Sequence, residues 1–200
     1  MVPSKNMPKS KRVPSLNSLA KIVYRALRCE RRTVNPPLTR RSTMPRQIYF
    51  RFVDEKVEGR LDLYENNAPV TCATIWQALA KPVRATSFHA MFAGPEIMVG
   101  LPPEAQTFDP SKVPVENQTV APGKGDCLWF YQGKNVMKGL TDELWEIGLF
   151  YDNGGRTFGP LGWTPVNIFA CMNHNLDEFA AACREIRLKG AKLLEIGRVA

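Results

Sequence analysis

The sequence has few of the residues on which metal and disulfide chemistry depend. It contains two histidines, His89 and His174, and five cysteines, an odd number without a C-x-x-C pair or an H-E-x-x-H motif. Protein zinc sites need closely spaced sets of His and Cys, and disulfide frameworks use paired cysteines. The sequence therefore predicts no metal site, and it predicts free thiols in a reducing, cytoplasmic environment.

Long hydrophobic runs and signature loops are also missing. No apolar run approaches the roughly eighteen residues that a membrane helix needs, so no membrane span is predicted. The sequence lacks a phosphate-binding loop, a dinucleotide fingerprint and a G-x-S-x-G nucleophile elbow. We therefore predict no cofactor.

Positive charge is present, but it is confined to one end of the chain. The net charge is +8, and residues 1–46 hold twelve Lys and Arg against Glu30 alone, a net +11 that leaves −3 for residues 47–200. Nucleic-acid-binding domains carry basic stripes on the folded part. We therefore expect no nucleic-acid binding through the core.

Residues 1–46 also differ from the rest in composition. Residues 1–14 and 33–46 are rich in Pro, Ser, Thr, Lys and Arg, whereas residues 15–29 carry apolar residues at helical spacing. Such a composition buries little surface, so we interpret residues 1–46 as a basic, disordered N-terminal extension. An organellar targeting signal and a functional binding arm are the alternatives. Residues 47–200 suffice for one domain with its own core.

From Gln47 onward, apolar and polar residues alternate as in β-strands. We predict strands at residues 48–53, 57–63, 84–92, 96–99, 126–131, 144–151, 166–172 and 193–199. We predict helices at residues 67–80, with Asn67 near the N-cap, and 176–189, capped by Asn175 and ended by Gly190. This order predicts a mainly β fold, a barrel whose ends are closed by helices.

Two segments rich in Gly and Pro, residues 88–102 and 151–172, interrupt the strand pattern. In the second, Asn153-Gly154-Gly155 is a tight-turn signal between two apolar runs. In segments of this kind, Gly and Pro give the backbone a defined irregular conformation that is neither a helix nor a strand. We interpret the two together as parts of a small-molecule pocket on a β scaffold.

Four separated segments carry a family resemblance: residues 88–102 (FHAMFAGPEIMVGLP), 115–131, 146–172 and 176–191. In this order they resemble a bacterial family of unknown function with a cyclophilin-like fold, over nearly all of residues 47–200. The resemblance implies a closed β-barrel of about eight strands with two helices. Cucumopine synthase is a more distant member of this superfamily, which implies that the scaffold can host carbon–nitrogen chemistry on small carboxylates. Fold alone does not assign a reaction.

Prolyl isomerisation is the activity that a resemblance to the cyclophilin fold first suggests. Cyclophilins place their catalytic arginine in a Phe-His-Arg tripeptide, and here Phe88-His89 is followed by Ala90. Without the guanidinium, the twisted amide would need another donor. We therefore do not expect peptidyl-prolyl isomerase activity.

Two residues are candidates for acid/base catalysis. His89 lies in a strand pattern and could act as a general base near neutral pH, although it could equally be a structural histidine. Glu96 follows a turn and precedes an apolar run, where desolvation would raise its pKa. If the turn is instead exposed, the pKa of Glu96 stays at its usual value. If adjacent strand ends bring the two together, they form an acid/base couple.

Arg156 could grip a substrate carboxylate in a bidentate manner beside the glycine-rich turn, or form a surface ion pair. Further polar and aromatic groups could line the same pocket, or belong to the core. These additional substrate-binding candidates are Glu116, Asn117, Tyr151, Trp163 and Asn167.

The residues together predict a domain that binds a small polar, carboxylate-bearing metabolite, and it could be an enzyme of the lyase, hydrolase or isomerase type. The alternative is a non-catalytic ligand-binding or assembly module. A proline-rich excursion beside apolar Ile97, Met98, Val99 and Leu101 also predicts a homo-oligomer, because these side chains could bury against a second copy.

Overall fold

The computed structural model describes residues 45–199, so the predictions for the N-terminal extension fall almost wholly outside the described residues. The strands are β1 (Gln47–Phe52), β2 (Val57–Leu63), β3 (Val83–His89), β4 (Glu96–Gly100), β5 (Gln118–Thr119), β6 (Asp126–Gln132), β7 (Leu144–Phe150), β8 (Phe158–Gly159), β9 (Gly162–Trp163), β10 (Val166–His174) and β11 (Lys192–Arg198). The helices are α2 (Pro69–Ala78) and α3 (Leu176–Lys189), with 3₁₀ turns η1 (Pro103–Ala105) and η2 (Pro110–Lys112).

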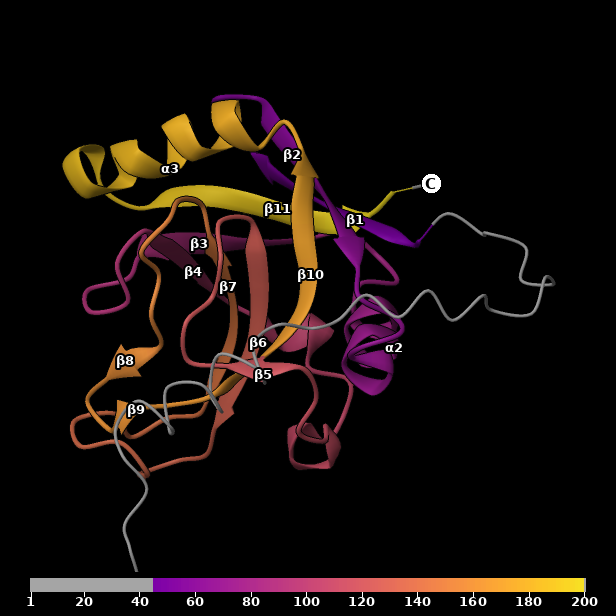
Figure 1. Cartoon of the computed structure of the whole chain (residues 1–200), viewed down its shortest axis with the longest axis vertical. Coiled ribbons are helices and arrows are strands. Elements are labelled where there is room, and N and C mark those ends of the chain that lie inside the picture. Colours follow the sequence, from indigo (N-terminus) through magenta and orange to yellow (C-terminus); the bar gives the residue numbers. More distant parts are fainter. Residues whose placement is uncertain (1–44, 200) are drawn as a thin grey trace, which may run out of the picture. The chain divides into compact units, whose positions relative to one another are not determined.

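Eight antiparallel strands close into a barrel (Figure 1). Their order is β2-β1-β11-β3-β4-β7-β6-β10, and β10 pairs again with β2 to complete the circle. β5 adds a short pairing at the N-terminal end of β10, and β8 and β9 form a separate two-stranded hairpin. The predicted mainly β barrel of about eight strands is confirmed.

Alternation along each strand decides which side chains fill the barrel. On β7, Trp145, Ile147 and Leu149 belong to the main core, and the residues between them point to the outer face. A second, smaller core on that outer face contains Ala93, Leu128, Phe150, Val166 and Ile168. The wall formed by β4, β7 and β6 is therefore covered on both of its faces.

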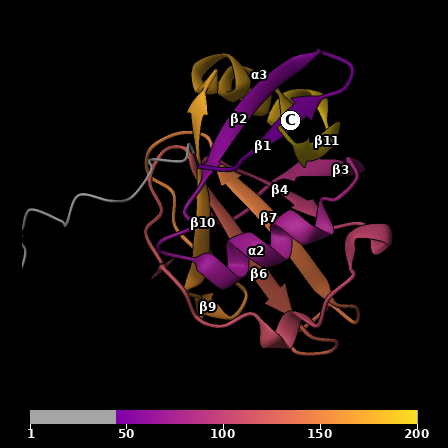
Figure 2. The ribbon, with the colours of Figure 1, turned by 90° about the vertical axis from the view of Figure 1, so that its right-hand side faces the viewer.

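The two helices lie on opposite sides of the barrel, α3 at the top left of Figure 1 and α2 at the lower right. On α3, Phe179 stacks on the Phe52 ring with centroids 4.7 Å apart. Both helices add their buried side chains to the main core. Figure 2 shows α2 crossing in front of the strands, with α3 above it.

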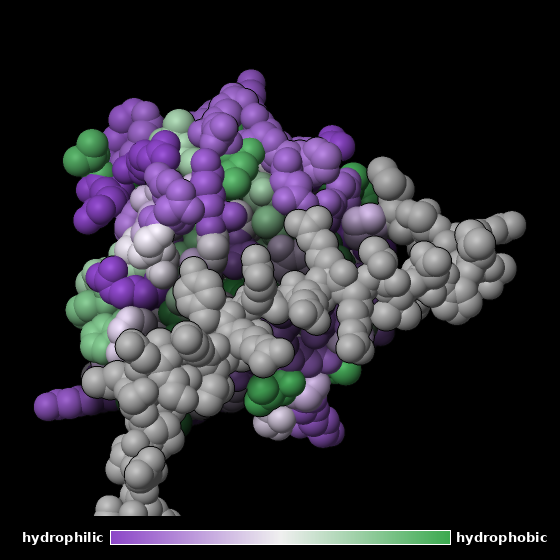
Figure 3. Space-filling view, viewed as in Figure 1, coloured by the Kyte–Doolittle hydropathy of each residue, from purple (hydrophilic) through white to green (hydrophobic). Residues whose placement is uncertain are grey.

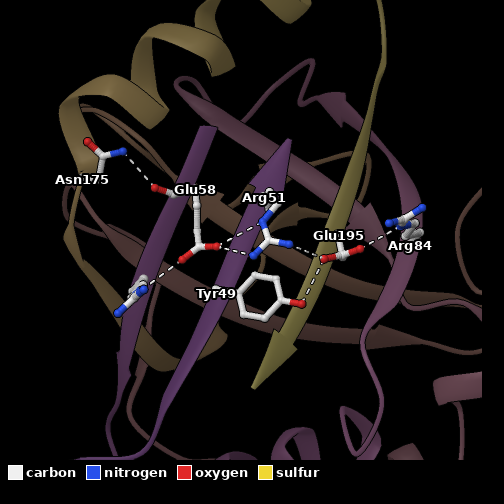
Figure 4. Close-up of polar contacts among 7 residues, drawn as sticks. Tyr49, Arg51, Glu58, Arg84, Asn175 and Glu195 are labelled. Carbon is white, nitrogen blue, oxygen red and sulfur yellow. Dashed lines mark hydrogen bonds and ion pairs between the residues drawn. The ribbon is translucent and has the colours of Figure 1, made fainter. Parts of the chain in front are cut away.

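The outer face of β2, β1, β11 and β3 carries a ladder of alternating charges (Figure 4). The carboxylates of Glu58 and Glu195 lie between three guanidinium groups, those of Arg60, Arg51 and Arg84. Three of these pairs cross between strands and Arg60–Glu58 lies along β2; all are partly exposed, so each contributes modestly to stability. This face is a satisfied polar surface, in contrast to the β4-β7-β6 wall.

Every predicted strand and both predicted helices are found, with ends displaced by at most a few residues. The prediction that Gly190 ends α3 is confirmed, since its amide donates to the Ile186 carbonyl oxygen at 3.0 Å. The two N-cap predictions are wrong. Helix α2 starts at Pro69, after Ala68, and Asn175 adopts a left-handed backbone with φ 58° without a side-chain cap bond. Its amide instead donates to the Glu58 carbonyl oxygen at 2.9 Å (Figure 4). An N-cap side chain normally acts from the β region, which explains the difference.

The tight-turn signal at residues 153–155 does not join two neighbouring strands. β6 lies between β7 and β10, and residues 151–165 instead leave the barrel and form the β8–β9 hairpin, with Gly162 at φ +87°. Two-residue strands leave too little alternation to be predicted, so β5, β8 and β9 were missed.

Candidate functional site

A cavity of about 230 Å³ lies on the outer face of the β4-β7-β6 wall. The β3–β4 loop, through Ala90 and Ala93, and the β8–β9 hairpin, through Thr157 and Leu161, cover it. In Figure 1 this hairpin stands to the left of β6 and β7. The cavity therefore joins parts of both segments that the sequence singles out as pocket-forming, residues 88–102 and 151–172.

The two covering segments are attached to each other and to the sheet by backbone hydrogen bonds. The Arg156 amide donates to the Ala93 carbonyl oxygen at 3.0 Å, and the Tyr151 amide donates to Pro95 at 3.0 Å. The Thr157 amide reaches the Val120 carbonyl at 3.0 Å. Since these bonds fix the cover, the cavity is preformed.

The walls of the cavity are apolar. Met98 on β4, Leu144 on β7, Leu128 and Phe130 on β6, and Val166 on β10 contribute them from the sheet. The rim exposes further apolar side chains, including Met91 at 87% of its surface. Figure 3 shows hydrophobic side chains at its left edge, where the β3–β4 loop lies in Figure 1.

Four polar side chains stand among these apolar groups. Glu96, Gln132, Thr157 and Glu146 line the cavity and are exposed by only 3%, 5%, 6% and 8%. Within residues 45–199, four of their buried atoms have no hydrogen-bond partner: Glu96 Oε1, both amide atoms of Gln132, and Thr157 Oγ1. Buried polar groups nearly always have a hydrogen-bond partner, so four buried polar atoms without one in a single cavity are unusual and need an explanation.

One glycine makes room for a carboxyl group. Gly148 lies between Met98 and Leu128 in the sheet, and an added Cβ would overlap Glu96 Oε1 and approach Leu128 Cγ to 3.0 Å. Gly100 lies beside Glu146 in the register, but an added Cβ there would meet no described residue beyond its chain neighbours within 4 Å. The missing side chain of Gly148 leaves a hollow in the sheet surface in which Glu96 rests.

Burial and proximity perturb both carboxyl groups. Burial raises the pKa of Glu96 well above its usual range, and the charge of Glu146 raises it further. Burial raises the pKa of Glu146 to about 7. The pair therefore loses one of its two protons as the pH rises through about 7, and with one proton left it can both donate and accept a hydrogen bond.

Of the sequence-predicted residues, Glu96 lines the cavity, and His89 does not. His89 pairs with Ile97 across the sheet, on the face opposite Glu96. Its Nδ1 lies 2.8 Å from the Ala90 carbonyl oxygen, to which it donates, and its Nε2 accepts from the Tyr151 hydroxyl at 2.7 Å. Burial lowers the pKa of His89 and raises that of Tyr151. The structure therefore does not bring His89 and Glu96 together as a couple.

Arg156 and Trp163 lie outside the cavity lining. Arg156 is exposed, and its guanidinium lies beside Gly94, next to cavity-lining Ala93. Among residues 45–199, no carboxylate pairs with it. Trp163 is 61% exposed and packs edge-on against Phe158, which does line the cavity. Both residues stand near the rim.

Glu116, Asn117 and Asn167 serve the framework. The Glu116 carboxylate accepts from the Val70 and Thr71 amides at 3.1 and 2.8 Å, and so caps helix α2 from a distant loop. Asn117 donates to the Ile168 carbonyl oxygen at 2.8 Å. Asn167 accepts from the Glu116 amide and donates to Thr71 Oγ1. These three residues hold β5 and α2 against β10.

Sequence reasoning missed Glu146, Gln132 and Thr157. A weak signal exists for the first two, because each is a polar residue at the outward position of an apolar strand, in LWEIGLF and DCLWFYQ. An outward polar residue normally faces water. These positions lie beneath covering segments, among them the β8–β9 hairpin, which was not predicted.

The apolar residues expected to face a second copy are internal. Ile97, Val99 and Leu101 are in the main core and Met98 lines the cavity. In the described part of the chain, no three His, Cys, Asp or Glu side chains gather as metal ligands. No helix there is long and apolar enough to cross a membrane.

The chain belongs to the family described as protein of unknown function DUF3830, whose model matches residues 52–197. No curated protein matches the sequence.

Solved structures show a similar fold. McbB, solved in complex with tryptophan, aligns with a TM-score of 0.52 and 16% identity over 76% of this chain and 44% of McbB, so the chain spans less than half of that protein. The hypothetical protein AF2241 from Archaeoglobus fulgidus gives a TM-score of 0.45 and 19% identity over 78% of this chain and 96% of its own. The Mimivirus cyclophilin gives a TM-score of 0.49 and 11% identity over 80% of this chain and 90% of its own. At a TM-score above 0.5, the McbB similarity shows a shared fold and no more.

Proposed function

We propose that the protein binds a small molecule in the cavity on the β4-β7-β6 wall. The ligand has an apolar body that fits against Leu128 and Phe130 and a polar end that bonds with Glu96, Glu146 and Gln132. The observation that carries the proposal is the group of four orphaned polar atoms in one apolar cavity.

An unpartnered buried polar group costs about 1–3 kcal/mol. Gln132 alone has two such atoms, and a leucine of similar volume would avoid the cost. A ligand that supplies the missing partners recovers this free energy on binding. Recovery of that kind makes binding specific, because a molecule without matching polar groups leaves the penalty in place.

For a ligand that also carries a carboxylate, as the sequence predicts, we propose that Arg156 binds it at the rim. The guanidinium lies next to the cover, outside the acidic floor. This arrangement would place the carboxylate away from Glu96 and Glu146, which would repel it. McbB shares the fold and has been solved with tryptophan, which supports a small-molecule role for the scaffold.

A second candidate function is acid/base catalysis at the same cavity. It is favoured by the carboxyl pair, because titratable groups with raised pKa values cluster where proton transfer occurs. In that case Glu96→Gln keeps ligand affinity and loses about two to four orders of magnitude in turnover. A binding module would show no turnover in either form. Conversion of bound compounds, followed by NMR, separates the two.

A cytoplasmic location and self-association remain proposals. The four described cysteines, Cys72, Cys127, Cys171 and Cys183, are free thiols, which supports a reducing compartment.

The test of cavity binding compares two glutamine variants in a thermal-shift screen of nitrogen heterocycles and organic acids. Gln132→Leu removes both orphaned amide atoms, so it should raise the melting temperature and abolish the ligand-induced shift. The control, Gln106→Leu, removes an amide that donates to the Leu101 carbonyl oxygen at 2.7 Å. It should lose stability and keep ligand binding.

A ligand at a hundred times its dissociation constant adds about 2.7 kcal/mol of stability. That corresponds to a shift of roughly 5–10 °C for a chain of this size. If compounds stabilise the wild type and Gln132→Leu equally, they bind elsewhere and the proposal fails.

A further inference from the structure

The cavity is lined by two acidic side chains and, among the described residues, by no basic one. Of the described residues that line it, Glu96 and Glu146 are titratable and none is Lys, Arg or His. On the surrounding elements, Lys134, Lys138 and Glu143 of the β6–β7 loop are exposed and outside the lining, as is Arg156 before β8. His89 points to the opposite face of the sheet. Among residues 45–199, the two carboxyl groups therefore have no counter-charge in the cavity.

Resting on the proposed function, we infer that the cavity selects a ligand with one cationic nitrogen, such as a primary or secondary ammonium or an amidinium, on an apolar body. The cation lies against the carboxyl pair, and its N–H groups donate to Glu96 Oε1 and to the Gln132 amide oxygen. Both of these acceptors are orphaned in the free protein.

The burial of the two carboxyl groups on the cavity floor makes this selection strong. Two charges a few ångströms apart interact several times more strongly near or inside a protein than in water. A buried carboxylate without a partner is correspondingly costly, and one cation relieves it. A neutral analogue gains the apolar contacts alone, and an anion is repelled by the same pair.

The proton balance follows from the state of the pair. When both carboxyl groups are protonated, an incoming cation displaces one proton to the solvent and leaves a cation beside one carboxylate. When the pair already holds a single proton, the cation binds without proton release. Since the pKa of Glu146 is about 7, affinity should rise with pH and level off above it, by about 30-fold between pH 5.5 and pH 8.

The experiment uses three probes with one shared benzyl body, measured by titration calorimetry on the full chain. Benzylammonium should bind, benzyl alcohol should bind at least tenfold more weakly, and phenylacetate should not bind. At pH 5.5, the benzylammonium enthalpy should differ between acetate and MES buffers by the amount expected for about one released proton. At pH 8 the enthalpies in phosphate and HEPES buffers should agree.

A double variant, Glu96→Gln with Glu146→Gln, keeps the volumes and removes both charges. It should lose the preference for benzylammonium and the pH dependence, while benzyl alcohol binding remains. Glu104→Gln on η1, an exposed position, is the matched control and should behave as the wild type.

Binding of benzyl alcohol or phenylacetate as tightly as benzylammonium, or an affinity that does not change with pH, overturns the inference. If those probes bind and Gln132→Leu removes them, the cavity still binds small molecules and only the charge selection fails. If none of the three probes binds, selection of a cationic nitrogen is likewise refuted. The wider heterocycle and acid screen then decides the proposed function by itself.

Discussion

Replacing Gly148 with alanine tests the geometry of the cavity floor directly. The residue lies between Met98 and Leu128 in the sheet, and its bare backbone leaves the space that Glu96 occupies. A methyl group there would overlap Glu96 Oε1 and approach two atoms of Leu128, Cγ to 3.0 Å and Cδ2 to 3.1 Å. Either the carboxyl group moves toward the cavity or the strands separate.

The cost follows from these contacts. Overpacking of a filled site typically costs about 1–3 kcal/mol. Alanine is intrinsically better than glycine in a strand by roughly 0.5–1 kcal/mol, which offsets part of it. Each kcal/mol lowers the melting temperature by roughly 2–4 °C at this chain length. We therefore expect Gly148→Ala to lower the melting temperature by several degrees and to weaken ligand binding.

Gly100→Ala is the matched control, because no atom of the described residues lies within 4 Å of its added Cβ. It should be neutral or slightly stabilising. The double variant Gly148→Ala with Glu96→Ala should recover part of the loss, since the carboxyl group no longer competes for the space. Urea unfolding of the wild type, of the single variants Gly148→Ala and Glu96→Ala and of the double variant completes the cycle. Equal stability of Gly148→Ala and Gly100→Ala would refute the assignment of Glu96 to this hollow.

Four further predictions can be checked with purified protein. Because burial raises the pKa of Glu146 to about 7, the folded state keeps a proton that the unfolded state loses, so the free energy of unfolding should fall on the order of 3 kcal/mol as pH rises from 4.5 to 7. Urea titrations measure this fall, and it should shrink when Glu96 and Glu146 are both Gln. Glu116→Ala should cost about 1–2 kcal/mol by removing the cap of α2, and a simultaneous loss of ligand binding would contradict that structural role. Arg156→Lys should weaken calorimetric binding of 4-(aminomethyl)benzoate and leave benzylammonium unchanged, because the guanidinium fork reaches the outer carboxylate alone. Since Ile97, Val99 and Leu101 are internal, self-association would have to use exposed apolar side chains at the rim, such as Met91 and Phe92; light scattering should then show a homo-oligomer at micromolar concentration, and a monomer would refute it.

The fold could be predicted from the sequence because the patterns that indicate strands and helices are formed by residues close together in the chain. Alternation in β1, β2 and β7 and helical spacing in α3 act within a few residues, and these elements are found where expected. The N-terminal cap of α2 depends on a distant group. Glu116 reaches α2 from another part of the chain, and no pattern near residues 67–71 indicates it.

The candidate site was predicted in part for the same reason. Glu96 stands beside an apolar run, so its desolvation could be anticipated locally. The burial of Gln132 and Glu146 depends on a cover that arrives from residues 157–164. Burial by a segment distant in sequence does not change the alternating pattern of β6 and β7. From that pattern, these two positions are predicted to face solvent.

The position of the cavity outside the barrel follows from how the barrel is filled. Large side chains such as Phe50, Phe52 and Phe169 pack its interior, so a ligand site has to be built on the outer wall. A wall selected for stability alone would carry apolar residues at Gln132 and Glu146, since they are buried beneath the cover. Polar groups kept there at a cost to stability are typical of sites where binding, and not folding, determines the residue.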